Sequence, residues 1–549
     1  MRAIKNPSLS LRVAAAAVAF GGMLASLHAQ TPIPWTVTWS VPPQQAPLLS
    51  SGFNNLSQQT LRQILHTSIS GSSVRVEISN VFGNTPIVVS DVHVANAVVN
   101  SDGSPTSSTI AGTDHAVTFS GSSTVTIPAG QIAESDGVGF TLPADADVMV
   151  SMYFPNGVPE SSIPTFAQDG GQNGMFLANG DVSAATSISP YSTFSSYYYL
   201  TGLQVQNPNS LGTVVALGAS ITAGDKSNFN VNHRWVNDLA QRLNTAGLQV
   251  GVANKGISGN GLLSGSNANP DAISRFTRDV LQQPNVRWVI FSDVIINTLS
   301  GAGTPPTFAS ITSAVKQLMQ QAHAQGIKFY CSTLTPNGGR PADQWTPAAE
   351  AIREQVDAFF LNPANGCDGI VDQDTATHDP ANPLQYRPAF NAGDFLHPND
   401  AGHQAIANAV NLGLFTANGV PPFTASTGCG TLLAGQGITP GHPLPSCNGR
   451  FQISLQGDGN LILYDGNTMV WSTQSSGHTP SVATLLADGN FVILDQAGKI
   501  FWSTATAGLL GDTLIMQNDG NLVLYTAPTA PNSPVWDSNT VAASKLLMY

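Results

Sequence analysis

A serine, an aspartate and a histidine with the chemistry of a nucleophilic catalyst lie in the central part of the chain. Ser220 follows the apolar run 214–217 in a Gly-rich stretch, which predicts a turn at the carboxyl end of a buried strand. Asp394 precedes His397 by three residues, a spacing that can place the carboxylate on Nδ1 and leave Nε2 to accept the serine proton. We expect Ser220 as nucleophile, His397 as base and Asp394 as the orienting group. For Ser220 taken alone, a plain structural turn is the alternative.

Strands and helices alternate around these residues. Runs of strand length occur at 214–217, 250–253, 288–291, 327–330 and 370–371, and helical periodicity occurs at 234–246, 310–324 and 348–361. About five such units predict a doubly wound α/β domain with a parallel sheet, in which sites gather at the carboxyl ends of the strands. The loop 254–260 follows the second strand, so it is expected at the same edge as the three candidate catalytic residues.

Together these motifs resemble those of the SGNH (GDSL-type) hydrolases, over roughly residues 211–415. The first block is matched around Ser220, the second ends at Gly259, and the fifth is matched by Asp394 and His397. The resemblance implies a flavodoxin-like domain at 207–420, with backbone N–H groups of Ser220 and Gly259 forming an oxyanion hole. It also implies an esterase or lipase that works through an acyl-enzyme without a metal or other cofactor. Many members remove acetyl groups from polysaccharides.

Two departures from the family pattern concern the residues around the nucleophile. Ala219 stands where the first block normally has an aspartate, and Asn297 comes one residue later than the third block requires, with no glycine before it. A local bulge would bring the Asn297 amide into the oxyanion hole, and we expect it there. Loss of one such donor typically costs 10²- to 10³-fold in rate. Without Asn297 the enzyme would be slow or its site partly vestigial.

Short alternating strands and frequent turn residues characterise the region before the α/β domain. Alternation at 74–79, 116–119 and 123–127 predicts an all-β sandwich or jelly roll at 30–206. Arg62 and His66 lie in one such segment, where we expect structural or interface roles. This region is also similar to one attached to some bacterial SGNH members.

A repeat occupies the C-terminal region. Three segments that contain Asp-Gly-Asn start 30 and 31 residues apart, and each is followed by a tryptophan: Trp471, Trp502 and Trp536. Three equivalent units with one tryptophan each predict a threefold β assembly around these rings.

Polar residues two apart within each repeat would share one face of a strand and suit sugar hydroxyls. The alternative is that Asp-Gly-Asn is only a hairpin turn. The pattern resembles the bulb-type mannose-binding lectins (β-prism), which implies a lectin domain at 429–545. The expected sugar-binding residues are Gln456, Asp458, Asn460 and Tyr464 in the first copy, Asp488 and Asn490 in the second, and Gln517, Asp519, Asn521 and Tyr525 in the third. The second copy has Leu486 and Leu494 at the other two positions, so binding there is doubtful.

The four cysteines divide into two pairs. Cys429 and Cys447 bracket a stretch rich in glycine and proline, and we expect a disulfide between them. Cys331 ends one predicted strand and Cys367 precedes the next, which would put them at opposite ends of a parallel sheet. We therefore expect these two as free, buried thiols.

The first 29 residues combine a basic start with an apolar run at 13–24 and Ala29 as a small residue at a cleavage point. This predicts a signal peptide and a secreted or periplasmic protein; an N-terminal membrane anchor is the alternative. Among all 549 residues only 10% are charged and the formal net charge is −13, which speaks against nucleic acid as partner. No later segment is apolar enough to predict a membrane span.

The combined hypothesis is a secreted serine esterase that deacylates a polysaccharide or glycan, with the lectin module attached to mannose-containing polymer. The alternatives are a glycan-binding protein whose hydrolase domain is weakly active or vestigial, and a lipase or arylesterase. The sequence does not indicate an oligomeric state.

Overall fold

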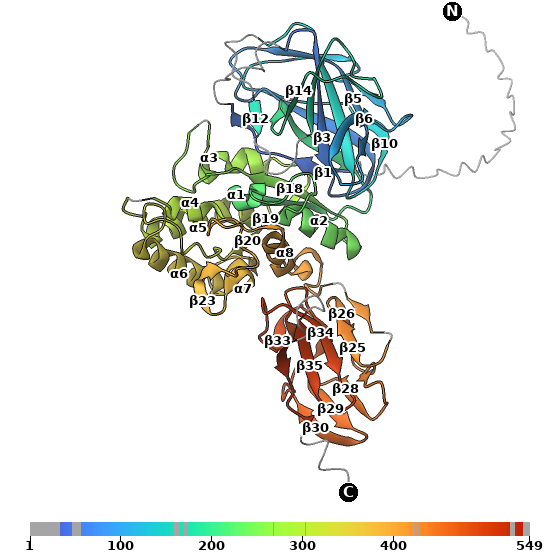
Figure 1. The fold of residues 1–549 in the computed structure, drawn as a ribbon, viewed down its shortest axis with the longest axis vertical. Coiled ribbons are helices and arrows are strands. Elements are labelled where there is room, and N and C mark those ends of the chain that lie inside the picture. Colours follow the sequence, from blue (N-terminus) through green and yellow to red (C-terminus); the bar gives the residue numbers. More distant parts are fainter. Residues whose placement is uncertain are drawn as a thin grey trace, which may run out of the picture. The chain divides into compact units, whose positions relative to one another are not determined.

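The computed structural model describes residues 33–46, 56–158, 165–167 and 174–541, except 267, 302, 422, 427 and 527–532 (Figure 1). The expected signal peptide lies outside these residues. No helix within the described part of the chain is both long and apolar enough to cross a membrane.

The N-terminal region consists of antiparallel sheets. One sheet has the order β1-β16-β4-β10 with β9 on β4, a second has the order β14-β13-β3-β11-β5-β6 with β7 and β8 on β5, and a small third one is β15-β12-β2. Alternate residues of β4, Val74, Val76 and Ile78, are fully buried in a core shared with the larger sheet. The predicted all-β character is confirmed. The strands are β1 (Trp35–Ser40), β2 (Gln44–Gln45), β3 (Gln59–His66), β4 (Gly71–Ser79), β5 (Ile87–Val99), β6 (Pro105–Thr109), β7 (His115–Val117), β8 (Thr124–Ile127), β9 (Ile132–Glu134), β10 (Val138–Leu142), β11 (Asp147–Phe154), β12 (Thr165–Ala167), β13 (Met175–Asn179), β14 (Ser192–Phe194), β15 (Tyr197–Tyr198) and β16 (Leu200–Gln206).

A parallel sheet of five strands with the order β18-β17-β19-β20-β21 forms the centre of the next region. The order reverses after β17, so right-handed crossovers put α2 on one face and α5 and α6 on the other. Helix α8 packs on α2. The alternating strands and helices are therefore as predicted. The strands are β17 (Gly212–Gly218), β18 (Val250–Gly256), β19 (Val286–Phe291), β20 (Lys328–Ser332), β21 (Gly369–Val371), β22 (His378–Asp379) and β23 (Asn382–Tyr386). The helices are α1 (Ser220–Ala223), α2 (Trp235–Thr245), α3 (Ala272–Phe276), η1 (Thr277–Leu281), α4 (Val294–Leu299), α5 (Phe308–Ala324), α6 (Pro347–Leu361), α7 (Gln373–Thr377), α8 (Asp400–Ala409) and η2 (Leu412–Phe415).

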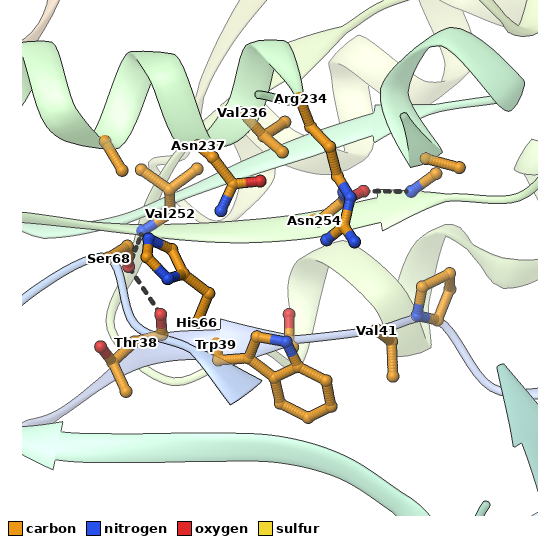
Figure 2. A pocket seen from close by; sticks show the side chains of 15 residues that line it. Thr38, Trp39, Val41, His66, Ser68, Arg234, Val236, Asn237, Val252 and Asn254 are labelled. Carbon is orange, nitrogen blue, oxygen red and sulfur yellow. Dashed lines mark hydrogen bonds between the residues drawn. The ribbon is translucent and has the colours of Figure 1, made fainter. Parts of the chain in front are cut away.

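Strand β1 lies against β18, the edge strand of the parallel sheet. Val37 belongs to the hydrophobic core of the parallel sheet, and the Ser68 hydroxyl accepts a hydrogen bond from the Val252 N–H at 2.9 Å. A cavity of about 40 Å³ lies between these elements. Among the side chains that line it, Trp39 and His66 lie on one side and Asn237 on the other (Figure 2). That volume holds a few water molecules, so this cavity is too small to be a substrate site.

His66 and Arg62 have structural roles, as expected. The His66 ring nitrogens lie 2.9 Å from carboxylate oxygens of Asp147 and Asp145, and Asn232 from the α/β region lies 2.9 Å from His66 Nδ1. Arg62 is fully buried and donates to backbone carbonyls and to a serine hydroxyl within its own region.

The C-terminal region has three small sheets, one around each copy of the repeat. Their orders are β24-β26-β31-β32-β33, β25-β34-β35-β36 and β27-β28-β29-β30. Trp471, Trp502 and Trp536 meet edge to face, with ring centroids 5.9 to 6.2 Å apart, so the predicted threefold assembly around these rings is confirmed. The strands are β24 (Thr424–Ala425), β25 (Thr431–Leu433), β26 (Gln436–Ile438), β27 (Leu444–Pro445), β28 (Phe451–Leu455), β29 (Leu461–Asp465), β30 (Thr468–Ser472), β31 (Pro480–Leu485), β32 (Phe491–Asp495), β33 (Ile500–Ser503), β34 (Gly511–Met516), β35 (Leu522–Thr526) and β36 (Pro534–Asp537).

All four cysteines form disulfides. Cys429 pairs with Cys447, as predicted, but Cys331 pairs with Cys367 at a Cα–Cα distance of 5.9 Å, so the prediction of two free thiols was wrong. Strand β21 has only three residues, and it begins with Gly369 opposite Tyr330. Cys331 lies opposite Ile370, which is only three residues after Cys367, so the two cysteines are close together and not at opposite ends of the sheet.

Candidate active site and sugar-binding repeats

The candidate nucleophile lies where β17 ends. Gly218 is the last residue of the strand, and Ser220 is the first residue of the short helix α1. A Cβ on Gly218 would lie 1.9 Å from Thr222 Oγ1, so only glycine allows this close approach of strand and helix. The turn predicted from the sequence is thus present, with Ser220 at the carboxyl edge of the sheet.

Ser220, His397 and Asp394 form a continuous chain of hydrogen bonds. His397 Nε2 lies 3.0 Å from the Ser220 hydroxyl, and His397 Nδ1 lies 2.7 Å from Asp394 Oδ2. The other oxygen, Oδ1, accepts the N–H groups of Leu396 at 3.0 Å and His397 at 2.8 Å. The structure therefore brings together the three residues singled out from the sequence.

The environment of Asp394 favours its charged form. Burial opposes ionisation, but the hydrogen bonds from the His397 ring and from two backbone N–H groups outweigh it and lower the pKa of Asp394. An ionised Asp394 requires a proton on His397 Nδ1, which leaves Nε2 free to accept the proton of the serine hydroxyl.

The loop after β18 approaches the same point. Asn254 donates from its amide to the Thr222 carbonyl at 3.0 Å, which ties the loop to helix α1. Gly259 has φ +75°, a conformation that favours glycine. Among the residues that the structure describes, none accepts a hydrogen bond from the backbone N–H of Ser220 or Gly259. Both N–H groups are therefore available to an oxygen outside the protein.

Asn297 lies in helix α4, which begins shortly after β19. Its amide donates to the Asn260 carbonyl at 3.1 Å, so one of its two N–H bonds holds the loop that carries Gly259. The role of Asn297 as an oxyanion donor stays a prediction.

Two acidic residues near the nucleophile, Asp225 and Asp293, were not among the site residues predicted from the sequence. Asp225 follows helix α1, and both of its carboxylate oxygens lie 2.8 Å from the hydroxyl of Ser258, next to Gly259; burial raises the pKa of Asp225. Asp293 follows β19 and bonds to the nucleophile turn. Asp293 stands two residues after a central strand of the sheet, and this position was the signal in the sequence that could have identified it.

The Asp-Gly-Asn segments are turns and not parts of strands, so the prediction that their polar side chains line one strand face was wrong. In the first copy Gln456 to Asn460 connect β28 to β29. Each aspartate, Asp458, Asp488 or Asp519, accepts the N–H of the asparagine two residues later at 2.9 to 3.0 Å. Such Asx turns compete with extended backbone.

The three asparagines of the repeats share one set of hydrogen-bond partners, which was not predicted from the sequence. In the first copy Asn460 Oδ1 accepts from the Thr473 hydroxyl at 3.1 Å and from the Ser475 N–H at 3.3 Å. Asn490 has the same partners in Thr504 and Thr506, and Asn521 in Ser538 and Thr540. Each asparagine therefore fastens its turn to the segment that directly follows the last strand of its copy, β30, β33 or β36.

The remaining predicted sugar-binding residues differ between the copies. In the third, the Gln517 amide donates to the Tyr525 hydroxyl at 2.8 Å, so these two side chains do meet. In the first, the Gln456 amide donates to the Ser454 hydroxyl, and Tyr464 is partly exposed on β29. Leu494 of the second copy is fully buried, and this copy has no equivalent polar pair.

Comparison with known proteins supports two separate likenesses. Residues 216–405 match the model of the GDSL-like Lipase/Acylhydrolase family. A candidate acylhydrolase from Bacteroides fragilis of known structure is 20% identical, with a TM-score of 0.28; the match covers 37% of this chain and 86% of that one.

The second likeness is to lectins. A mannose-specific lectin from Dendrobium findlayanum is 38% identical over 66 residues, which are 12% of this chain and 38% of that lectin. Among solved structures, a Marasmius oreades lectin is 32% identical (TM-score 0.20; 22% of this chain, 97% of that one), and the mannose-specific snowdrop agglutinin from Galanthus nivalis is 29% identical (TM-score 0.17; 19% and 99%). The chain thus contains a GDSL-like lipase/acylhydrolase domain at 216–405, within a multidomain protein that is mostly β.

Proposed function

We propose that the protein is a serine ester hydrolase that removes acyl groups, acetyl in the first instance, from a glycan. The observation that carries this proposal is the chain of hydrogen bonds from Ser220 through His397 to Asp394. Two backbone N–H groups without an acceptor among the described residues, those of Ser220 and Gly259, support it further.

The reaction would proceed in two halves. The Ser220 oxygen attacks the ester carbonyl carbon while His397 Nε2 takes the hydroxyl proton, and the tetrahedral oxyanion accepts hydrogen bonds from the two backbone N–H groups. Collapse breaks the bond to the alcohol, which leaves with the proton from His397. Water then attacks the acyl-enzyme with His397 again as base and releases the carboxylic acid.

The C-terminal repeats would bind mannose-containing polymer. Their likeness to mannose-specific lectins supports this role, with the first and third copies as the binding sites. Attachment to the polymer would raise the effective concentration of ester groups at Ser220 without changing the chemical step. The protein would act outside the cytoplasm, since two disulfides suit an oxidising compartment and the N-terminal sequence predicts export.

Ser220→Ala tests the proposal. The variant should release no 4-nitrophenol or acetate above background from 4-nitrophenyl acetate and acetylated glycans, while the full-length chain keeps its retention on immobilised mannan. Hydrolysis that survives the substitution, or a wild-type protein inactive on a broad ester panel, would contradict the proposal.

A second candidate is a glycan-binding protein whose hydrolase domain is weakly active. The Asn297 amide bonded to Asn260 and the absence of a carboxylate at Ala219 favour it. A kcat several orders of magnitude below that of ordinary esterases, together with intact mannan binding, would support it. If activity on 4-nitrophenyl esters increases with the length of the acyl chain, the protein is a lipase or arylesterase instead.

A further inference from the structure

We propose that Asp293 is a positioning residue for the nucleophile: its carboxylate fixes the turn so that the Ser220 N–H stays free for the oxyanion. This inference rests on the proposed function, because it assigns a task in the same reaction. It concerns a residue that neither the Ser-His-Asp chain nor the oxyanion donors include.

The carboxylate of Asp293 bonds to both sides of Ser220. Its Oδ1 accepts the N–H of Ala219 at 3.0 Å and the Thr222 hydroxyl at 2.6 Å, and its Oδ2 accepts the N–H of Ile221 at 2.9 Å. Asp293 is only 2% exposed. A buried carboxylate with three donors is a rigid acceptor, since each lost hydrogen bond would leave the desolvation of the carboxylate less well compensated.

These hydrogen bonds leave the N–H group of Ser220 without an acceptor among the residues that the structure describes. A helix begins with N–H groups that have no partner within the helix, and Asp293 takes those of the two residues that flank Ser220. The N–H of Ser220 itself has no acceptor among the described residues. Both oxygens of Asp293 are already used on its neighbours, so the free donor is placed for the substrate oxygen.

The carbonyl side of the same turn is held by a buried cation. Arg275 donates to the Gly218 carbonyl at 2.8 Å and to Asn260 Oδ1 at 2.8 Å, and it pairs with Asp279 at 3.1 Å. Arg275 therefore connects the end of β17 to the loop that carries Gly259, while Asp293 holds the N–H groups. The two expected oxyanion donors are thereby fixed relative to each other.

The carboxylate that bonds to this turn comes from Asp293, since Ala219 has none. Ala219 is fully buried, and its own N–H is one of the three donors to Asp293. A carboxylate from the end of the neighbouring strand β19 thus reaches the nucleophile turn.

Asp293→Asn is the decisive variant. An amide has the same shape but turns an NH₂ group toward one of the N–H donors, so the turn should shift. We expect kcat on 4-nitrophenyl acetate to fall by roughly 10²-fold while KM changes by less than about 3-fold, because the lost contact acts on the transition state. The rate at which a fluorophosphonate probe labels Ser220 should fall in parallel, and the pH at half-maximal activity should stay the same.

Asp238→Asn is the matched control. Asp238 is a buried carboxylate on α2, in the same domain, and it does not bond to the turn. Its replacement should leave kcat and labelling within about 3-fold of wild type. If Asp293→Asn does not fold, Thr222→Val removes one donor to Asp293 and should lower kcat more than Thr222→Ser, which keeps the hydroxyl.

The outcomes separate the two claims. A wild-type protein that the probe does not label at Ser220 overturns the proposed function and this inference with it. Labelling of wild type together with equal kcat and labelling rates in Asp293→Asn and Asp238→Asn overturns the inference alone. A fall in kcat accompanied by a shifted pH profile assigns Asp293 to the tuning of His397 and also overturns it.

Discussion

The α/β region and the repeat region differ in what they bury. The α/β region buries ionisable side chains: Arg234, Asp238, Lys255, Arg275, Asp279, Asp293, Glu350, Arg353, Asp357 and His403. In the described part of the repeat region the buried polar residues are uncharged: Ser446, Thr484, Thr504, Thr506, Asn521, Ser538 and Thr540. The two regions thus bury polar groups of different chemistry.

The difference follows from how far apart in the sequence the partners lie. His397 and Ser220 are separated by 177 residues, and the loops around them are fixed by charged hydrogen bonds, which are stronger than neutral ones. Each repeat instead joins an asparagine to a hydroxyl 13 to 17 residues later. A site assembled from distant loops therefore depends on buried charge, whereas a site repeated locally needs only neutral bonds. The following experiments test this distinction.

Asp394→Asn should have the largest effect. The amide cannot hold His397 in the tautomer that presents a basic Nε2 to Ser220, so kcat should fall by roughly 10³- to 10⁴-fold. Steady-state hydrolysis of 4-nitrophenyl acetate measures it, and an unchanged thermal unfolding transition of the α/β region shows that the fold is intact. A loss of less than 10-fold would mean that the Asp394 carboxylate does not orient His397.

The sequence predicted those features of the site that depend on local spacing. Asp394 and His397 are three residues apart, and Ser220 follows a recognisable strand, so their meeting at one sheet edge followed from the alternation of strands and helices. The disulfide between Cys331 and Cys367 did not follow, because it depends on the register between β20 and a strand of three residues. Asp293 was missed for a similar reason, since its partners lie about 70 residues away.

The two disulfides should stabilise different functions. By loop closure over 36 and 18 residues, the pair Cys331–Cys367 should contribute about 4 kcal/mol and Cys429–Cys447 about 3 kcal/mol. Replacing the first pair by serine should lower the temperature at which ester hydrolysis is lost. Replacing the second should lower the temperature at which mannan binding is lost. If either change affects both functions equally, the two regions do not unfold independently.

Asp238→Asn should stabilise the protein above neutral pH. Burial raises the pKa of Asp238 to about 7, and its Oδ2 has no hydrogen-bond partner among the described residues. The folded state thus keeps a proton that the unfolded state releases near pH 4, so stability is lost as the pH rises from about 4 to 7. The variant should remove this loss and gain on the order of 2 kcal/mol at pH 8. Thermal unfolding at pH 4 and pH 8 would show it, and a variant less stable than wild type at pH 8 would contradict the assignment.

The smallest effects are expected in the repeats, where the three copies serve as controls for one another. Gln517→Ala removes the partner of the Tyr525 hydroxyl and should weaken mannan binding by roughly 5- to 10-fold, about 1 kcal/mol, the value of one ordinary hydrogen bond. Leu486→Ala in the second copy, at the position equivalent to Gln517, should leave binding unchanged, because that copy lacks the polar pair. Isothermal titration with mannotriose measures both. If the leucine variant loses as much affinity as the glutamine variant, binding depends on the shared β assembly and not on the polar pair, and the repeats are not independent local sites.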